Sequence, residues 1–469
     1  MGDRPAHAHD LDGPSPLELD PETMRRLGHR VVDLLVDRIA ALEDDRAGRT
    51  GDRDDLAARF AQPPPEEPGD FEQLVERLRA DALPFTQRTD HPRFLAYVPG
   101  APTWPAVLGE LLASGHNVFG GSWVGASGPT VVELTVLDWF KRWLGLPADA
   151  EGLLTSGGSE ANLLAVLCAR STLLGEETAD AVVYLSGQTH SSVERAARAA
   201  GFRTSQLRLV ETDGRFRLRP DRLAREIAAD RAASRTPFLV AANAGATSTG
   251  AIDPLPALAD LCAEEGLWLH ADAAYGGFFC LTDRGRAALE GLARADSITL
   301  DPHKGLAVQW GTGCLLVRRP GLLADAFHLL PDYLRDAAVE GGEVNFFDRG
   351  LQLTRPARGL KIWLGVGTFG TAAFRAALDR ALDVTERAER WVAADRRVEL
   401  AAPASLGIVC FARRDGRDGE AIARLNESGL AHVSSTRLGG RTVCRICCNG
   451  FRTRWRDVER VLEALAGPL

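Results

Sequence analysis

The sequence predicts an α/β protein with a mostly parallel central sheet, helices on both faces of that sheet, and smaller parts at both ends. Three observations lead to this class. Short, continuously apolar runs alternate with helical stretches between residues 181 and 318, which is typical of parallel strands buried on both faces. A linker with three prolines at 63–65 and Pro68-Gly69 follows an N-terminal helical stretch. After Arg355 a long helix and short strands replace the alternation, which indicates a smaller α+β domain.

Residues 1–90 are expected to form an N-terminal helical arm, of which 1–19 are expected to be disordered. Asp20 followed by Pro21 predicts a helix start, because an acidic N-cap and a proline at the first position favour one. Apolar residues then recur at helical spacing from Leu27 to Leu42. That apolar stripe needs a partner surface, so we expect the arm to dock on another subunit.

The large α/β domain is expected at residues 91–355 and the small one at 356–469. A helix is expected from Pro129 to Leu144, because Gly145 supplies a stop signal. The strands expected in the large domain are Ala181–Ser186, Gln206–Val210, Phe238–Asn243, Leu267–Ala271, Ser297–Leu300 and Gly313–Arg318. Helices are expected between most of them, at Ser192–Ala200, Asp221–Ala229 and Pro254–Glu265, and the small domain is expected to hold a helix at 357–394 and strands at 407–413, 431–435 and 442–448.

Composition narrows the class of protein. The 469 residues are 45% hydrophobic, which is enough for two or three domains with a full core. The 55 basic residues against 64 acidic ones give a net charge of −9, which disfavours nucleic-acid partners. No long uncharged apolar run indicates a membrane span, and residues 1–16 lack the apolar core of a secretory signal, so we expect a cytoplasmic protein.

The eight cysteines do not suggest a disulfide framework in a chain of this length. Three of them cluster at Cys444, Cys447 and Cys448, but they fall in a predicted strand with no second pair of ligands nearby. No metal site is therefore expected.

A lysine at a strand end is the first candidate functional residue. The run 297–300 ends in Asp301-Pro302, and proline cannot continue a strand ladder. The turn presents His303 and Lys304 where open α/β sheets bind their ligands. A partly desolvated lysine has a lowered pKa and becomes a nucleophile toward carbonyl groups. Taken alone, the same pattern also fits a surface lysine in a loop.

Three further strand ends carry polar residues. The turn Ser156-Gly157-Gly158 leads into a helix at about Ser159, and free N–H groups there form a phosphate cradle. Asp272 ends the most apolar strand, where a buried carboxylate needs a positive or donating partner. His190 follows the strand 181–186. Each alone also fits a bare helix N-terminus, an N-cap aspartate or an ordinary loop histidine.

Together these residues suit the chemistry of pyridoxal 5'-phosphate (PLP). Lys304 would hold the cofactor as an imine, and Asp272 would keep its pyridine nitrogen protonated so that the ring accepts electrons. His190 would cover the ring face, and the glycine-rich turn would hold the phosphate. The sequence therefore predicts a PLP enzyme.

The same stretches resemble the group II PLP-dependent amino acid decarboxylases, and the aromatic-L-amino-acid decarboxylase branch is the most similar. The resemblance implies a type I aminotransferase-like fold and a homodimer with active sites at its interface. It implies α-decarboxylation of an aromatic or bulky hydrophobic L-amino acid to the amine and carbon dioxide. It runs from about Pro21 to the C-terminus and rests on Thr155–Asn162, Thr189–Glu194, His270–Gly277 and Asp301–Lys304.

The resemblance also implies roles for particular residues. The catalytic residues are Lys304, His190, Asp272 and Tyr333, of which Tyr333 lies at the place of a mobile loop whose tyrosine protonates the α-carbon after carbon dioxide leaves. The expected cofactor-binding residues are Gly157, Gly158, Ser159, His190, Thr247, Asp272, Ala274, Asp301, His303 and Lys304.

Three glycines depart from the pattern of the family. Relatives usually carry tryptophan where this chain has Gly305, and larger residues at Gly100 and Gly121. The expected substrate pocket comprises Val98, Pro99, Gly100, Phe119, Gly121 and Gly305. The glycines favour a pocket opened for a bulky substrate over one refilled by neighbouring aromatic rings such as Phe119, Trp104, Trp123 and Trp310.

Other functions remain open from the sequence. A PLP-dependent aldehyde synthase shares the motifs, although such enzymes usually lack one of the two residues retained here as His190 and Tyr333. A non-catalytic PLP-binding protein would also carry them. A serine hydrolase would use Ser159, Asp272 and His303, which follow the hydrolase order.

Overall fold

The computed structural model describes residues 15, 17–329, 332, 336 and 341–468. Contacts within the chain divide it into two compact units, residues 1–86 and 87–469. The predicted division at residues 90 and 355 stays a prediction. In the described part of the chain no helix is long and apolar enough to cross a bilayer.

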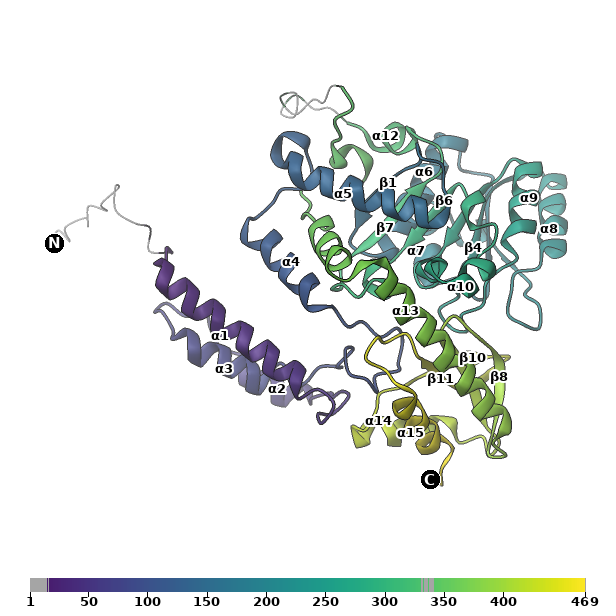
Figure 1. The fold of residues 1–469 in the computed structure, drawn as a ribbon. Coiled ribbons are helices and arrows are strands. Elements are labelled where there is room, and N and C mark those ends of the chain that lie inside the picture. Colours follow the sequence, from purple (N-terminus) through teal and green to yellow (C-terminus); the bar gives the residue numbers. More distant parts are fainter. Residues whose placement is uncertain (1–14, 16, 330–331, 333–335, 337–340, 469) are drawn as a thin grey trace, which may run out of the picture. The chain divides into compact units, whose positions relative to one another are not determined.

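The elements follow one another along the chain as drawn in Figure 1. The helices are α1 (Pro21–Ala40), α2 (Arg53–Phe60), α3 (Phe71–Asp81), α4 (Trp104–Gly115), α5 (Trp123–Leu144), α6 (Gly158–Leu173), α7 (Ser191–Ala199), α8 (Pro220–Ala232), α9 (Leu255–Glu265), α10 (Asp283–Ala288), α11 (Pro302–Gly305), α12 (Leu322–Phe327), α13 (Gly359–Ala394), α14 (Asp418–Ser428) and α15 (Trp455–Ala466). The strands are β1 (Glu151–Thr155), β2 (Ala181–Ser186), β3 (Leu207–Val210), β4 (Thr236–Asn243), β5 (Trp268–Asp272), β6 (Ser297–Leu300), β7 (Gly313–Val317), β8 (Val398–Ser405), β9 (Ile408–Arg413), β10 (Ser434–Leu438) and β11 (Arg441–Cys447).

The first unit is a helical arm. Asp20 caps α1 by accepting hydrogen bonds from two backbone N–H groups, as the sequence predicts. Ion pairs from Arg26 and Arg30 to Glu72 join α1 to α3. None of the residues of α1 is buried, and Val31 remains 38% exposed. The apolar stripe of α1 is therefore only partly covered within its own unit.

The second unit is built on a seven-stranded sheet in the order β1-β7-β6-β5-β4-β2-β3. Strand β7 runs antiparallel to β1 and β6, and the other neighbours are parallel. Every residue of β1, β2, β5, β6 and β7 is buried, so the sheet is covered on both faces. The mostly parallel, doubly covered sheet that the sequence predicts is confirmed.

A second, antiparallel sheet lies near the C-terminus in the order β10-β11-β9-β8. Its residues Val409, Phe411 and Ile446 pack with buried residues of α13, α14 and α15 in a separate hydrophobic cluster. Helix α13 also packs on α4, α5 and β8, so it connects the two sheets (Figure 1). The expected small α+β part of the chain is thereby confirmed as a fold element.

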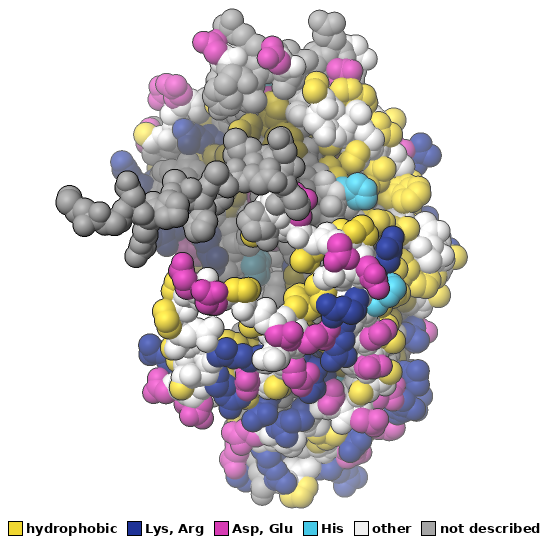
Figure 2. Space-filling model, turned by 90° about the vertical axis from the view of Figure 1, so that its left-hand side faces the viewer, with side chains coloured by type: hydrophobic (Ala, Val, Ile, Leu, Met, Phe, Trp, Pro, Cys, Tyr) yellow, Lys and Arg dark blue, Asp and Glu magenta, His cyan; other side chains and the backbone are white. Residues whose placement is uncertain are grey.

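Charges of both signs are mixed on the surface. Figure 2 shows Lys and Arg side chains interspersed with Asp and Glu over the lower half of the visible face.

Candidate active site

Five parallel strands deliver polar residues to one edge of the large sheet. Strands β1, β2, β4, β5 and β6 run in the same direction, so their carboxyl ends meet at that edge. The residues that follow these ends line one cavity of about 290 Å³. All ten residues expected to bind the cofactor lie on its wall: Gly157, Gly158, Ser159, His190, Thr247, Asp272, Ala274, Asp301, His303 and Lys304.

Lys304 lies in the short helix α11, which follows strand β6. Its ammonium Nζ is 2.8 Å from Oδ2 of Asp301, which is buried. The Nδ1 of His303 lies 2.7 Å from the carbonyl of Thr312, so it carries the hydrogen and donates. Desolvation lowers the pKa of His303, which keeps the ring neutral. Lys304 is thus held by a carboxylate beside a neutral imidazole.

Asp272 ends β5 and is 8% exposed. Its Oδ2 accepts from Nδ2 of Asn162 at 3.0 Å, and its Oδ1 accepts from the backbone N–H of Ala274 at 3.1 Å. Both partners within the described residues are neutral donors. A buried carboxylate of this kind is suited to a cationic ligand group, such as a protonated pyridine nitrogen.

The glycine-rich turn after β1 brings its backbone close to the cavity. Gly157 has φ 150° and carries no capping side chain for α6, so the first N–H groups of this 16-residue helix stay available. A Cβ at Gly158 would lie 3.0 Å from Oδ2 of Asp301 and 3.2 Å from Cβ of Ala274. The turn therefore fits a bound phosphate, and the donor set of the whole cavity fits PLP.

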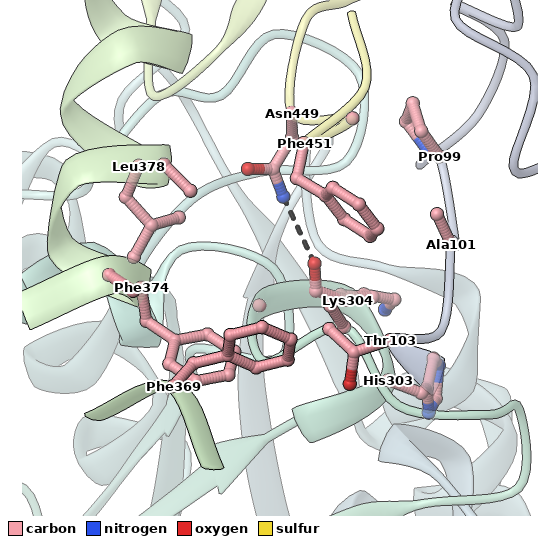
Figure 3. Close-up of a pocket in the computed structure, with 15 residues that line it drawn as sticks. Pro99, Ala101, Thr103, His303, Lys304, Phe369, Phe374, Leu378, Asn449 and Phe451 are labelled. Carbon is pink, nitrogen blue, oxygen red and sulfur yellow. Dashed lines mark hydrogen bonds between the residues drawn. The ribbon is translucent and has the colours of Figure 1, made fainter. Parts of the chain in front are cut away.

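A second cavity of about 190 Å³ adjoins the first. His303 and Lys304 line both. Figure 3 shows Phe369, Phe374 and Leu378 on one side of Lys304 and Pro99 and Ala101 on the other. The backbone carbonyl of Lys304 accepts a hydrogen bond of 3.1 Å from Nδ2 of Asn449. The lysine thus separates a polar cavity from an apolar one.

The expected enlargement of the substrate pocket at three glycines is wrong. A Cβ at Gly100 would lie 2.5 Å from Cζ2 of Trp310, and one at Gly305 would lie 2.6 Å from Cβ of Phe278. A Cβ at Gly121 would lie 2.4 Å from the carbonyl of Leu353, with the Phe119 ring next. Neighbouring groups occupy each space, and of the predicted pocket residues only Pro99 and Gly305 line the apolar cavity; Val98, Gly100, Phe119 and Gly121 line neither cavity.

Sequence reasoning missed several residues of the polar cavity. Asn162, Ser192, Asn243 and Tyr275 lie on its wall. Asn162 belongs to a stretch that resembles the family, but its place inside a predicted helix gave no sign that it contacts Asp272. The expected loop tyrosine, Tyr333, lies outside the described residues.

The hydrolase alternative does not match the geometry. Asp272 bonds to Asn162 and Ala274, and the Nδ1 of His303 bonds to the Thr312 carbonyl. Within the described residues no hydrogen bond joins Ser159, Asp272 and His303 into a relay, which a serine nucleophile requires.

Comparison with known proteins agrees with this geometry. Residues 54–414 match the pyridoxal-dependent decarboxylase conserved domain, so the chain belongs to this family. It is 38% identical to an aromatic-L-amino-acid decarboxylase of Bacillus atrophaeus over 95% of each chain, and 30% identical to a phenylacetaldehyde synthase of Arabidopsis thaliana over 95% of this chain and 96% of that one. The crystal structure of Oryza sativa TDC with PLP and tryptamine superposes with a TM-score of 0.91 at 29% identity, covering 97% of this chain and 98% of that one.

The class of protein is therefore defined. The chain is a PLP-dependent amino acid decarboxylase with the type I fold of this family. The predicted class of enzyme and its cofactor are confirmed.

Proposed function

We propose that the chain releases carbon dioxide from aromatic or bulky hydrophobic L-amino acids and yields the amine. One observation carries this substrate class: the apolar cavity meets the polar cavity at Lys304 and His303. Phe374 and Leu378, both largely buried, form part of its wall. Such a wall favours an apolar side chain and leaves a charged one without a partner. The names of the Bacillus and Oryza proteins support the same class.

In this proposal Lys304 attaches the cofactor. Its contact with the Asp301 carboxylate, at 2.8 Å, places a proton acceptor next to Nζ. When bound, PLP supplies an electron sink for the electron pair left as the carboxylate departs. Asp272 would bind the positively charged group of the cofactor at the end of the cavity. Its two hydrogen-bond donors, Asn162 and the Ala274 N–H group, are neutral, so its negative charge has no counter-ion in the described residues.

His190 is proposed to cover the ring of the cofactor. It is exposed on the cavity wall, where the N-terminus of α7 begins. Partial desolvation lowers the pKa of His190, and the nearby Asp272 carboxylate opposes that shift. The ring is therefore neutral at pH 7 and can stack on a flat ligand or donate one hydrogen bond.

Tyr333 is proposed to deliver the final proton to the α-carbon. This role distinguishes decarboxylation to the amine from oxidation to the aldehyde, which the Arabidopsis relative's name describes. The presence of both His190 and Tyr333 supports the amine outcome.

We also propose a homodimer. The support is the apolar stripe of α1, on which no residue is buried and Val31 and Leu35 are 38% and 37% exposed. A second copy of the chain would cover this stripe. Sedimentation of the purified protein tests this part of the proposal.

A cytoplasmic location belongs to the proposal as well. All eight cysteines are free and buried, as expected for a chain that folds under reducing conditions.

The substrate class can be tested with a panel of amino acids. Purified protein with PLP is incubated with L-tryptophan, L-tyrosine, L-phenylalanine, L-leucine, L-lysine and L-glutamate, and carbon dioxide and amine are measured. We expect equal yields of the two products from the aromatic members and little from lysine or glutamate. Preference for a charged amino acid would contradict the substrate class, and aldehyde with oxygen uptake would favour the synthase alternative.

A further inference from the structure

A chain of buried hydrogen bonds joins Asp272 to His190 beneath the floor of the polar cavity. Its members come from β5, β6, α6 and the start of α7, and each side chain is almost fully buried: Trp268 1%, His270 0%, Ser297 0%, Thr299 0%, Asn162 1% and Ser192 3% exposed. None of these residues was assigned a role by the sequence. Their donor and acceptor atoms leave one consistent direction for every hydrogen.

The direction is fixed first at Asn162. Asp272 is acceptor-only when ionised, so the amide NH₂ of Asn162 must face it, at 3.0 Å. The same Nδ2 donates to Oγ of Ser192 at 2.8 Å. The amide oxygen then faces the other way and accepts from the Thr299 hydroxyl at 2.6 Å.

The hydrogen bonds on the other side of Asn162 are consistent with this orientation of its amide. The indole N–H of Trp268 can only donate, and it does so to Oγ of Ser297 at 2.8 Å. The Ser297 hydroxyl is then turned to Nδ1 of His270, also at 2.8 Å. His270 must carry its hydrogen on Nε2, which lies 3.0 Å from Oδ1 of Asn162. Burial lowers the pKa of His270 to about 4, which is consistent with a neutral ring in this position.

The series of hydrogen bonds that starts at Asp272 ends at His190. Because Ser192 accepts from Asn162, its own hydroxyl hydrogen is free to point at Nδ1 of His190, 2.7 Å away. The backbone N–H of Ser192 also donates to that nitrogen, at 3.3 Å. Two donors directed at Nδ1 require a lone pair there, so the hydrogen of the neutral ring resides on Nε2.

We infer that Asn162 and Ser192 are positioning residues that fix His190 as the Nε2–H tautomer and couple this choice to the ionised form of Asp272. The inference rests on the proposed function, because it concerns how His190 meets the cofactor and the substrate. In this tautomer Nε2 is a hydrogen-bond donor and cannot accept a proton. Such a group suits a carboxylate or another acceptor in the cavity, and it excludes His190 as a base through that atom.

The tautomer can be measured directly. Protein labelled with ¹⁵N-histidine is studied by long-range ¹H–¹⁵N correlation at pH 7.5, in the apo form and with PLP, since the pattern of cross-peaks distinguishes Nε2–H from Nδ1–H rings. His190→Gln identifies the signal by its absence. We expect Nε2–H in the wild type in both forms. Nδ1–H in the wild type would overturn the inference.

Asn162→Asp should reverse the result. The oxygen that replaces Nδ2 stands next to Asp272, and the two carboxyl groups share one proton between them. That oxygen therefore accepts from the Ser192 hydroxyl instead of donating to it, so the Ser192 oxygen turns a lone pair to His190 and Nδ1 gains the proton. The variant is nearly isosteric, and circular dichroism shows whether it folds. A folded Asn162→Asp protein whose Nδ1 stays unprotonated would overturn the inference.

Ser192 offers a matched pair that does not depend on the first variant. Ser192→Ala leaves only the longer backbone donor at 3.3 Å, so a measurable Nδ1–H population should appear. Ser192→Thr keeps the hydroxyl and should give the wild-type spectrum. If the spectrum of Ser192→Ala is identical to that of the wild type, Ser192 and Asn162 do not set the tautomer of His190, and the inference is overturned. The spectra do not depend on turnover, so this result stays separate from the outcome of the substrate panel.

Discussion

Phe278 fills the space beside Gly305: a Cβ at Gly305 would lie 2.6 Å from both Cβ and Cδ2 of Phe278. The ring also packs edge-on against Phe140, with ring centroids 5.1 Å apart. The absence of a side chain after the lysine is therefore compensated within the core. The two positions should behave as a pair in mutagenesis.

Gly305→Trp should destabilise the protein, because overpacking a filled core typically costs about 1–3 kcal/mol. Phe278→Ala should cost about 3–5 kcal/mol by leaving a cavity. We expect the double variant to be more stable than the sum of the two losses predicts, since the indole can enter the vacated space. Urea unfolding of all four proteins measures this coupling, and strictly additive losses would contradict the compensation.

The apolar cavity can be narrowed from α13. Ala377 lines it, whereas the neighbouring Ala376 is exposed and does not. Ala377→Phe should lower kcat/KM for tryptophan by about 10- to 200-fold, the range for a misfit of about 1–3 kcal/mol, and reduce it less for smaller amino acids. Ala376→Phe is the matched control and should behave as the wild type. Equal losses on every substrate would show that the side chain does not occupy this cavity.

Tyr333→Phe should change the product rather than substrate binding. The variant keeps the aromatic ring but lacks the hydroxyl group that would deliver the proton. Carbon dioxide release should therefore continue while the amine yield falls. Aldehyde, ammonia and oxygen uptake should rise in the same assay. An unchanged ratio of amine to carbon dioxide would refute the proposed role of Tyr333.

His270 should contribute a pH dependence to folding. Its pKa is lowered from 6.5 to about 4 in the folded protein, so below pH 6.5 the unfolded chain takes up a proton that folded His270 does not. Stability should therefore fall as the pH drops from 6.5 toward 4, by about 2–3 kcal/mol from this group. His270→Gln retains a donor and an acceptor without titrating, and urea unfolding of the apo protein at pH 7.5 and 5 should show a smaller loss for it. Parallel losses in the two proteins would contradict this assignment.

The strands that carry the site were predictable because their signals are local. Strands β2 and β6 match their predicted bounds, since each is a continuous apolar run closed by a turn. Strand β1 is not among the predicted strands, because Glu151 and Gly152 interrupt its apolar pattern. Strand β8 was missed, because Pro403 and its alanines are poor strand formers; it lies at the edge of its sheet, where proline is tolerated.

Long-range packing was not predictable in the same way. Phe278 and Gly305 are far apart in sequence, and no periodicity links them. The hydrogen bond between Asn162 and Asp272 also joins distant segments. The residue types at the strand ends were therefore sufficient to predict the cofactor, whereas the shape of the substrate pocket required the folded chain.

Lys304 as the attachment point of PLP is the central claim, and the chain allows a sharp test because it contains only three lysines. Lys141 donates to the carbonyl of Ala148, and Lys361 is 2.7 Å from Glu110. Borohydride treatment of the PLP-loaded protein, followed by peptide mapping, should place one pyridoxyl group on Lys304 and none on the other two lysines. Lys304→Ala should abolish the label and carbon dioxide release together. A label on Lys141 or Lys361, or turnover that survives Lys304→Ala, would contradict the account.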